Sequence, residues 1–144
     1  MTKKEEIDNR FGKFGTVSFT AVTHVNDFIG YLEQGKIMGT RCTTCGLKFF
    51  PPRADCYKSL DSKMEWFEVK GTGKLLSYSA LTFAPTGFTQ DLPYTIAVLD
   101  YGDYKIFGRI DSSIPVKELA VGMEMKTVVH KLPNDHMNYV FQKA

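Results

Sequence analysis

The segment that decides the fold contains all three cysteines of the chain and reads Gly39-Thr-Arg-Cys42-Thr-Thr-Cys45-Gly-Leu-Lys-Phe-Phe-Pro-Pro-Arg-Ala-Asp-Cys56-Tyr-Lys-Ser59. Cys42 and Cys45 form a Cys-x-x-Cys pair that is followed directly by Gly46. This spacing lets two thiolates converge on one tetrahedral metal ion, and the glycine permits the tight turn. The same spacing begins again at Cys56, but its second position is Ser59. The segment therefore predicts a zinc ribbon with one sulfur ligand missing, and Cys42, Cys45 and Cys56 as the metal ligands.

The serine leaves the fourth position of the zinc site open. A serine hydroxyl is a poor zinc ligand at neutral pH because it holds its proton too tightly. The three thiolates could be completed by a carboxylate, from Asp55 or Asp61, or by water. Alternatively, the ribbon has lost its metal and is held by the packing of Phe49, Phe50 and Tyr57. No His or Glu lies between Cys42 and Ser59 to serve as a general base, so we expect a structural rather than a catalytic ion.

Composition and charge narrow the class of protein. The chain has 144 residues, of which 43% are hydrophobic and 24% charged, as in ordinary soluble domains. Its net charge of +2 is too small for strong electrostatic binding to nucleic acid. No apolar run approaches the roughly 20 residues of a membrane-spanning helix, and the first residues lack the apolar core of a secretory signal. An odd cysteine count argues against a disulfide framework. These features predict a cytoplasmic protein without a membrane partner.

Residues before the cysteine segment predict one helix. Val25, Phe28, Ile29 and Leu32 are spaced i, i+3, i+4, i+7 and form one apolar stripe, so we expect a helix over about 25–34. Alternation at 17, 19 and 21 suggests a short strand before it. Phe11 and Phe14, further towards the N-terminus, lie either on a loosely tethered arm or on an arm that orders against a partner.

Residues after the cysteine segment have a β pattern. Strands are expected at 74–83, 94–99, 104–110, 123–129 and 138–141, with one helical turn at 116–120 between the third and fourth. This is the element order of an OB barrel. The predicted fold is mainly β: an N-terminal helix and a rubredoxin-like zinc ribbon followed by a five-stranded OB-fold barrel. We expect an N-terminal arm and helix at 1–35, a zinc ribbon at 36–62 and the OB-fold at 63–144.

Several short motifs together resemble a known family. They are Cys-x-x-Cys-Gly at 42–46, Phe50-Pro-Pro-Arg53, Cys56, Trp66 and Gly71-Thr-Gly73, followed by Pro93-Tyr94, Val98-Leu99-Asp100, Gly108-Arg109 and Val121-Gly-Met123. Over roughly residues 25–142 the chain resembles the zinc-ribbon/OB-fold family known as domain of unknown function thirty-five. It departs from that family at Ser59, where a fourth cysteine is usual.

The resemblance implies a function. Members of that family are non-catalytic partners of thiolases and of hydroxymethylglutaryl-CoA-synthase-like enzymes, and they help to form the acyl-CoA site. One branch resembles the small subunit of a thiolase that acts on aromatic acyl-CoA esters. A hetero-oligomer with a thiolase-like subunit is therefore expected, with acyl-CoA bound through that partner. Coenzyme A carries phosphates and a long arm, for which Lys48, Arg53 and Lys74 offer positive charge and Phe49 or Phe50 an apolar wall.

The residues give no positive reason to expect catalysis by this chain alone. His24, His130 and His136 are not paired with a nucleophile or a carboxylate in any recognisable motif. The alternative function is binding of single-stranded nucleic acid, which OB barrels and zinc ribbons also perform. The aromatic residues that would form its stacking platform are Tyr78, Phe83, Tyr94, Tyr104 and Phe107. Their type suits a barrel core equally well, and the net charge disfavours this alternative.

Overall fold

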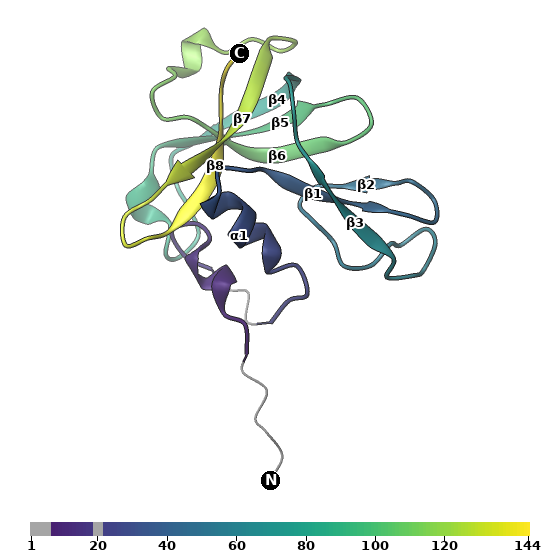
Figure 1. Cartoon of the computed structure of the whole chain (residues 1–144). Coiled ribbons are helices and arrows are strands. Elements are labelled where there is room, and N and C mark those ends of the chain that lie inside the picture. Colours follow the sequence, from purple (N-terminus) through teal and green to yellow (C-terminus); the bar gives the residue numbers. More distant parts are fainter. Residues whose placement is uncertain (1–6, 19–21) are drawn as a thin grey trace.

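The structure, a computed structural model, describes residues 7–18 and 22–144 (Figure 1). Its helical elements are η1 (Arg10–Lys13), α1 (Asp27–Glu33), η2 (Thr89–Asp91) and η3 (Val116–Glu118). Its strands are β1 (Met38–Cys42), β2 (Lys48–Phe49), β3 (Met64–Glu68), β4 (Gly73–Leu81), β5 (Tyr94–Asp100), β6 (Lys105–Ile110), β7 (Glu124–Lys131) and β8 (Met137–Lys143). The predicted fold class is confirmed: a helix, a zinc ribbon and a closed five-stranded barrel follow one another along the chain.

The first three strands form a small antiparallel sheet in the order β2-β1-β3. Its long pairing joins β1 to β3, with Gly39 opposite Phe67 and Cys42 opposite Met64. A Cβ atom on Gly39 would lie 2.6 Å from the carbonyl oxygen of Phe49, so only glycine lets the neighbouring strand approach this closely. Residues 64–68 thus pair within the ribbon sheet, although the domain division proposed from the sequence places them on the barrel side.

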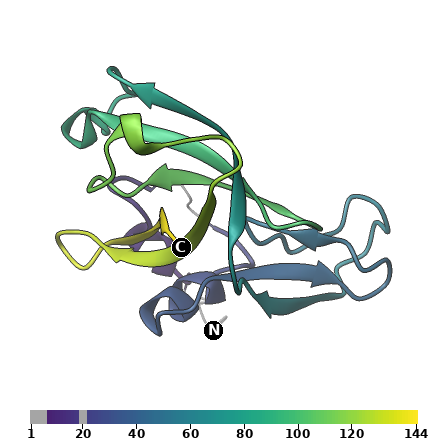
Figure 2. The same ribbon diagram turned by 90° about the horizontal axis from the view of Figure 1, so that it is seen from above.

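The remaining strands close a barrel in the order β4-β5-β6-β8-β7. All neighbours are antiparallel except β6 and β8, which run parallel. Alternate residues of β5 and β6 point inward because side chains change face at every position of a strand. The buried core of the barrel consists of Leu75, Ala97, Leu99, Ile106, Ile110, Leu119, Met125 and Phe141. Figure 2 shows the ribbon extending sideways from this barrel.

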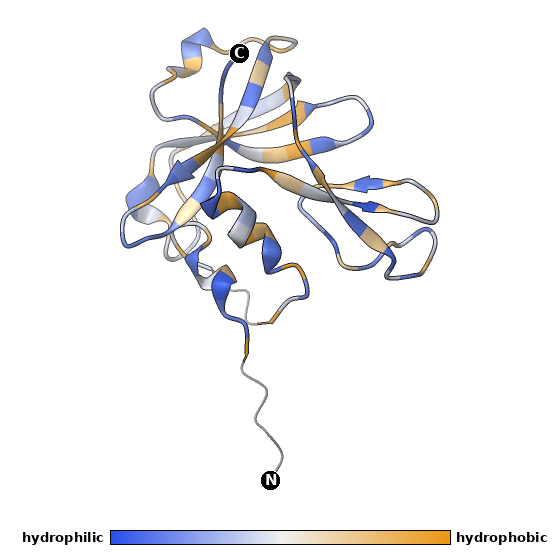
Figure 3. Ribbon diagram, in the orientation of Figure 1, coloured by the Kyte–Doolittle hydropathy of each residue, from blue (hydrophilic) through white to orange (hydrophobic). Residues whose placement is uncertain are grey.

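Helix α1 joins the ribbon to the barrel. Three of the four predicted stripe residues, Phe28, Ile29 and Leu32, are fully buried on α1, as the spacing predicts, whereas Val25 precedes the helix and is half-buried. Figure 3 shows apolar residues on α1 and on the barrel strands. The stripe packs against half-buried side chains of both modules, namely Phe50, Trp66, Val69, Val129, Met137 and Tyr139. Three of these, Phe50, Val69 and Tyr139, also contact the barrel core, so the two apolar clusters are continuous.

Phe11 and Phe14 pack against other parts of this chain. This arrangement differs from both predictions, a loosely tethered arm and an arm ordered by a partner. The rings of Phe11 and Phe14 lie 6.0 and 5.8 Å from that of Phe28. An ion pair from Arg10 to Asp27 at 2.8 Å holds η1 beside α1. The strand expected around residues 17–21 falls partly on 19–21, which lie outside the described residues, and residues 17 and 18 are not in a strand. Among the described residues, no helix has the length and apolar character of a membrane span.

Candidate metal centre and surrounding surfaces

Two loops of the ribbon adopt the same turn and face each other. In the first loop the backbone N–H of Gly46 donates to the carbonyl of Cys42 at 2.8 Å. In the second, the N–H of Leu60 donates to the carbonyl of Cys56 at 3.0 Å. Gly46 and Leu60 both take positive φ, +79° and +61°. Ser59 therefore occupies in the second loop the position that Cys45 occupies in the first.

The three cysteines predicted as ligands lie together. Their sulfur atoms are all within 4.8 Å of one another, and Cys45 Sγ is 3.6 Å from Cys56 Sγ. Zinc–sulfur bonds of about 2.3 Å in a tetrahedron place two sulfurs about 3.8 Å apart. Cys42 and Cys56 are buried and Cys45 is exposed. The donor set and its spacing therefore fit a zinc ion, held by Cys42, Cys45 and Cys56 with one further position.

Hydrogen bonds from the second loop favour the thiolate form of two of these ligands. The Ser59 hydroxyl lies 3.2 Å from Cys42 Sγ, and the Ser59 backbone N–H donates to Cys56 Sγ at 3.4 Å. The side chain and then the backbone of Ser59 lower the pKa of Cys56 to about 6. The Ser59 hydroxyl also lowers the pKa of Cys42. Because zinc binds thiolates rather than thiols, the loop prepares these sulfurs as ligands.

The two aspartates considered for the fourth position lie differently. Asp61 Oδ1 is 3.9 Å from Cys42 Sγ, and its Oδ2 accepts a hydrogen bond of 2.7 Å from the Thr44 hydroxyl. Asp55 instead accepts a hydrogen bond from the Ser62 hydroxyl. Asp61 therefore faces the cysteine cluster, whereas Asp55 is engaged with Ser62. Of the aromatics that were expected to hold a metal-free ribbon, Phe49 and Tyr57 pack together at 5.8 Å, whereas Phe50 packs on α1.

Two of the residues expected to bind acyl-CoA are engaged with aromatic rings. Lys48 Nζ forms an ion pair of 2.8 Å with Asp103 and lies over the rings of Phe67 and Tyr104. Its hydrogen bond lowers the pKa of Asp103. The contact ties the ribbon to the turn between β5 and β6. The exposed guanidinium of Arg53 covers the rings of Phe49 and Tyr57, at 5.3 and 5.8 Å.

The other two residues expected to bind acyl-CoA have different neighbours. The ring of Phe50 lies between Phe28 at 6.0 Å and Tyr139 at 5.2 Å, at the junction of ribbon, helix and barrel. Lys74 is exposed on β4, opposite Asp100 of β5. Lys48, Phe50 and Arg53 thus contact different groups of neighbours, and Lys74 lies on the barrel strand β4.

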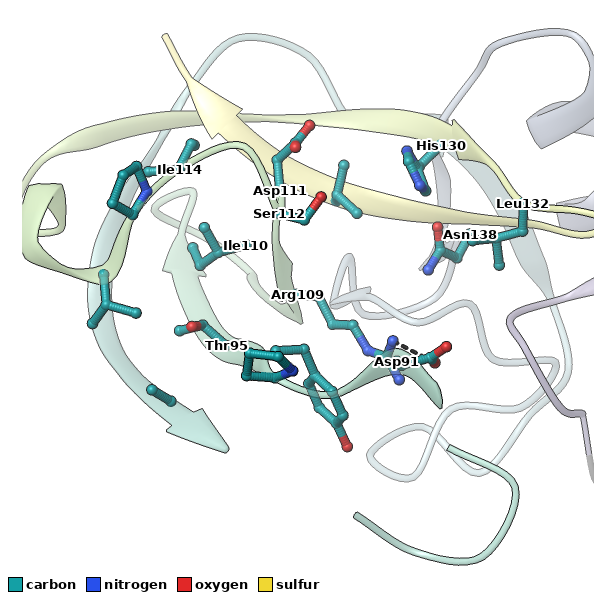
Figure 4. A pocket seen from close by; sticks show the side chains of 16 residues that line it. Asp91, Thr95, Arg109, Ile110, Asp111, Ser112, Ile114, His130, Leu132 and Asn138 are labelled. Atoms are coloured by element: carbon teal, nitrogen blue, oxygen red, sulfur yellow. Dashed lines mark hydrogen bonds and ion pairs between the residues drawn. The ribbon is translucent and has the colours of Figure 1, made fainter. Parts of the chain in front are cut away.

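A cavity of about 390 Å³ opens in the barrel wall (Figure 4). Arg109 crosses it and forms an ion pair of 2.8 Å with Asp91, which also accepts a hydrogen bond of 2.6 Å from the Thr16 hydroxyl. The guanidinium lies 4.0 Å from the centre of the Tyr94 ring. His130 and Asn138 come from the β7–β8 hairpin. Sequence reasoning missed the Asp91–Arg109 pair because 18 residues separate its members and no local pattern joins them.

The aromatic residues of the nucleic-acid alternative do not share one environment. Tyr94 lies against Arg109, and Tyr104 stacks on Tyr101 with ring centres 5.3 Å apart. Burial raises the pKa of Tyr104 to about 12, with smaller contributions from Tyr101 and Asp103. Phe83 and Phe107 are exposed. Two of the five rings are therefore already stacked on neighbours in the chain.

Two apolar side chains of the second loop, Leu60 and Tyr57, are largely exposed and are called the ribbon tip below. Leu60 is 84% exposed and Tyr57 is 62% exposed. The ribbon that carries them is the basic part of the molecule. Residues 36–62 contain five basic and two acidic side chains, a formal charge of +3, and the rest of the chain is therefore −1. The ribbon tip therefore presents exposed apolar side chains on a positively charged module.

Comparison with known proteins identifies both modules. Residues 31–65 match the model of the rubredoxin-like zinc ribbon domain of ChsH2, and residues 66–130 match that of the C-terminal OB-fold domain of ChsH2. A DUF35 domain-containing scaffold protein of Methanocaldococcus jannaschii is 33% identical over 106 residues, which cover 72% of this chain and 74% of that protein. A DUF35 domain-containing scaffold protein of Pyrococcus furiosus is 24% identical over 102 residues, 71% of this chain and 74% of its own.

Two solved structures share the fold. A chain of the Ltp2–ChsH2(DUF35) aldolase superposes with a TM-score of 0.71 at 20% identity and covers 86% of this chain and 98% of its own. A DUF35-family protein of unknown function from Sulfolobus solfataricus superposes with a TM-score of 0.55 at 19% identity, covering 92% and 90%. At these identities the likeness shows the arrangement of ribbon and barrel.

Proposed function

Because this chain belongs to the DUF35 family of zinc-ribbon and OB-fold proteins, we propose that it is a non-catalytic scaffold subunit of an enzyme complex that acts on acyl-CoA. The observation that carries the proposal is the 33% identity to a DUF35 scaffold protein over nearly three quarters of both chains. The fold shared with a chain of an Ltp2–ChsH2 aldolase supports it, since that chain belongs to an enzyme assembly. The zinc ribbon is proposed to have a structural role, as a rigid platform beside the barrel.

The enzyme that it serves is proposed to be a thiolase or a hydroxymethylglutaryl-CoA-synthase-like protein. This step rests on the family resemblance of the sequence motifs. Lys48, Arg53 and Lys74 are proposed to supply positive charge towards the CoA phosphates, and Phe50 an apolar wall, once the partner completes the site. The chain would then bind acyl-CoA only as part of the complex.

Co-expression with the thiolase-type subunit from the same source tests the proposal. A complex should co-purify, and the thiolase should lose solubility or activity when this chain is omitted. A thiolase that is soluble, complete and fully active alone would reject the proposed role. Salt-dependent binding of short single-stranded oligonucleotides by this chain would instead favour the nucleic-acid alternative.

Backbone strain at the ribbon tip supports a docking role for Leu60. A left-handed backbone costs a non-glycine residue about 1–2 kcal/mol, and the equivalent position of the first loop is Gly46. An exposed leucine side chain contributes little packing energy to the stability of its own chain. Strain of this kind is often retained where a residue has a function. We therefore infer that Leu60 and Tyr57 insert into an apolar pocket of the enzyme subunit, whose acidic rim meets the positive ribbon.

Leu60→Gly is expected to stabilise the free protein and to weaken the complex. Removing the strain should raise the free energy of unfolding by about 1 kcal/mol, measured by urea denaturation. Loss of the apolar contact should lower affinity for the thiolase subunit by about tenfold or more, measured by titration calorimetry. The control is Val121→Ala, at another exposed aliphatic residue, which should leave affinity unchanged. Unchanged affinity of the Leu60→Gly protein would contradict the docking role.

A further inference from the structure

The second ribbon loop copies the first in its backbone but differs in two side chains. The N–H of Cys42 donates to the carbonyl of Leu47 at 2.9 Å, and the N–H of Cys56 donates to the carbonyl of Asp61 at 3.0 Å. Superposed by these bonds, Ser59 corresponds to Cys45 and Asp61 corresponds to Leu47. The loop that lacks its second sulfur is therefore also the loop that carries a carboxylate.

We propose that the Ser59 hydroxyl oxygen is the fourth zinc ligand and that the Asp61 carboxylate, acting as a positioning residue, accepts the hydrogen bond of that hydroxyl. The Ser59 oxygen lies 3.2 Å from Cys42 Sγ. An oxygen and a sulfur bound to one tetrahedral zinc, at about 2.0 and 2.3 Å, are about 3.5 Å apart. The hydroxyl thus stands close to the place of the missing sulfur.

The neighbouring Asp61 carboxylate can strengthen the serine hydroxyl as a zinc ligand. A neutral hydroxyl is a weak ligand because its oxygen shares little electron density while it holds its proton. Asp61 Oδ1 lies 3.9 Å from Cys42 Sγ, the same sulfur that the Ser59 hydroxyl approaches to 3.2 Å. A carboxylate therefore stands beside the hydroxyl and can accept its hydrogen bond once the oxygen binds zinc. Carboxylates also accept hydrogen bonds from zinc-bound histidines, and this contact raises the basicity of the histidine ligand.

Asp61 is fixed in this supporting position by its other contacts. Its Oδ2 accepts from the Thr44 hydroxyl at 2.7 Å, and its Oδ1 accepts from the Lys63 N–H at 3.2 Å. Thr44 lies between the two cysteines of the first loop, so the carboxylate links both loops. Asp61 is not within 4.8 Å of all three sulfurs, as a direct ligand in this arrangement would be. Asp55, by contrast, accepts a hydrogen bond from the Ser62 hydroxyl, so Asp55 is the matched control.

The test is zinc coordination and zinc affinity of the full chain and five variants. X-ray absorption at the zinc edge should show three sulfurs and one oxygen in the unaltered protein and in Ser59→Thr, and four sulfurs in Ser59→Cys. Competition with a chromophoric chelator should show about 10–100-fold weaker binding for Ser59→Ala and Asp61→Asn, and unchanged binding for Asp55→Asn. Ser59→Cys should bind zinc more tightly.

Three outcomes would overturn the proposal. If Ser59→Ala keeps full affinity while Asp61→Asn weakens binding, Asp61 itself is the ligand. If both variants keep full affinity, water completes the site. If the unaltered protein takes up no zinc, the ribbon is held by side-chain packing alone. Ser59→Thr and Ser59→Cys retain a donor atom, so they keep the test decisive even if Ser59→Ala misfolds.

Discussion

Stripping zinc from the protein is expected to unfold the ribbon and leave the barrel folded. The buried cluster of the ribbon contains only Cys42, Phe49 and Cys56, with Leu47 and Met64 packed against it. So small an apolar cluster does not offset the conformational entropy of about 25 residues. Structural zinc contributes about 10–16 kcal/mol in small zinc modules, so its loss removes the main stabilising term. The barrel has its own core of eight buried residues, so we expect it to stay folded without the metal.

Hydrogen exchange followed by mass spectrometry measures this directly. After treatment with a zinc chelator, amides at 42–63 should lose protection, whereas those of β5 and β6 should keep it. Restoring zinc should reverse the change, and Cys42→Ala without chelator should reproduce it. A ribbon that stays protected without metal would contradict the prediction and show that Phe49 and Tyr57 packing is sufficient.

The ribbon was predictable because its information is local. Metal-ligand spacing such as that of Cys42 and Cys45 reflects the geometry of one short turn, which the sequence specifies without knowledge of distant contacts. The helix was predictable for a similar reason, since its apolar stripe spans only seven residues. The barrel strands followed from β-rich segments separated by turns, and their order matched a common topology.

Features that depend on distant pairing were not predictable in the same way. The sequence does not reveal that Phe50 packs between Phe28 and Tyr139, a contact that forms because the ribbon folds back on α1. The ion pair between Lys48 and Asp103 joins residues of different modules. No sequence pattern predicts either contact, since each depends on how the ribbon packs against the barrel.

The strained position of Leu60 shows a different limit. Glycine or asparagine commonly marks a left-handed turn, and Gly46 does so in the first loop. Leucine carries no such signal, so the second loop reads as an ordinary segment until its geometry is known. The conflict between residue type and backbone is what makes the position informative about function.

Phe28→Ala is expected to be the most damaging single substitution outside the metal site, lowering the free energy of unfolding by about 3–5 kcal/mol. Phe28 is only 1% exposed. Its ring contacts Phe11 and Phe14 of the N-terminal segment and Phe50 of the ribbon, at centre distances of 5.8–6.0 Å. Aromatic pairs add about 0.5–1.5 kcal/mol each beyond their buried area. The substitution therefore opens a cavity where three parts of the chain meet.

Phe83→Ala is the matched control, because it makes the same chemical change at a ring that is 81% exposed and should alter stability by about 0.5 kcal/mol or less. Urea denaturation of both zinc-loaded variants, followed by tyrosine and tryptophan fluorescence, separates them. Equal unfolding midpoints would mean that α1 does not couple the modules. A large loss confined to Phe28→Ala, with zinc still bound, would show that the helix rather than the metal joins the ribbon to the barrel, because Phe28 contacts Phe50 and no zinc ligand.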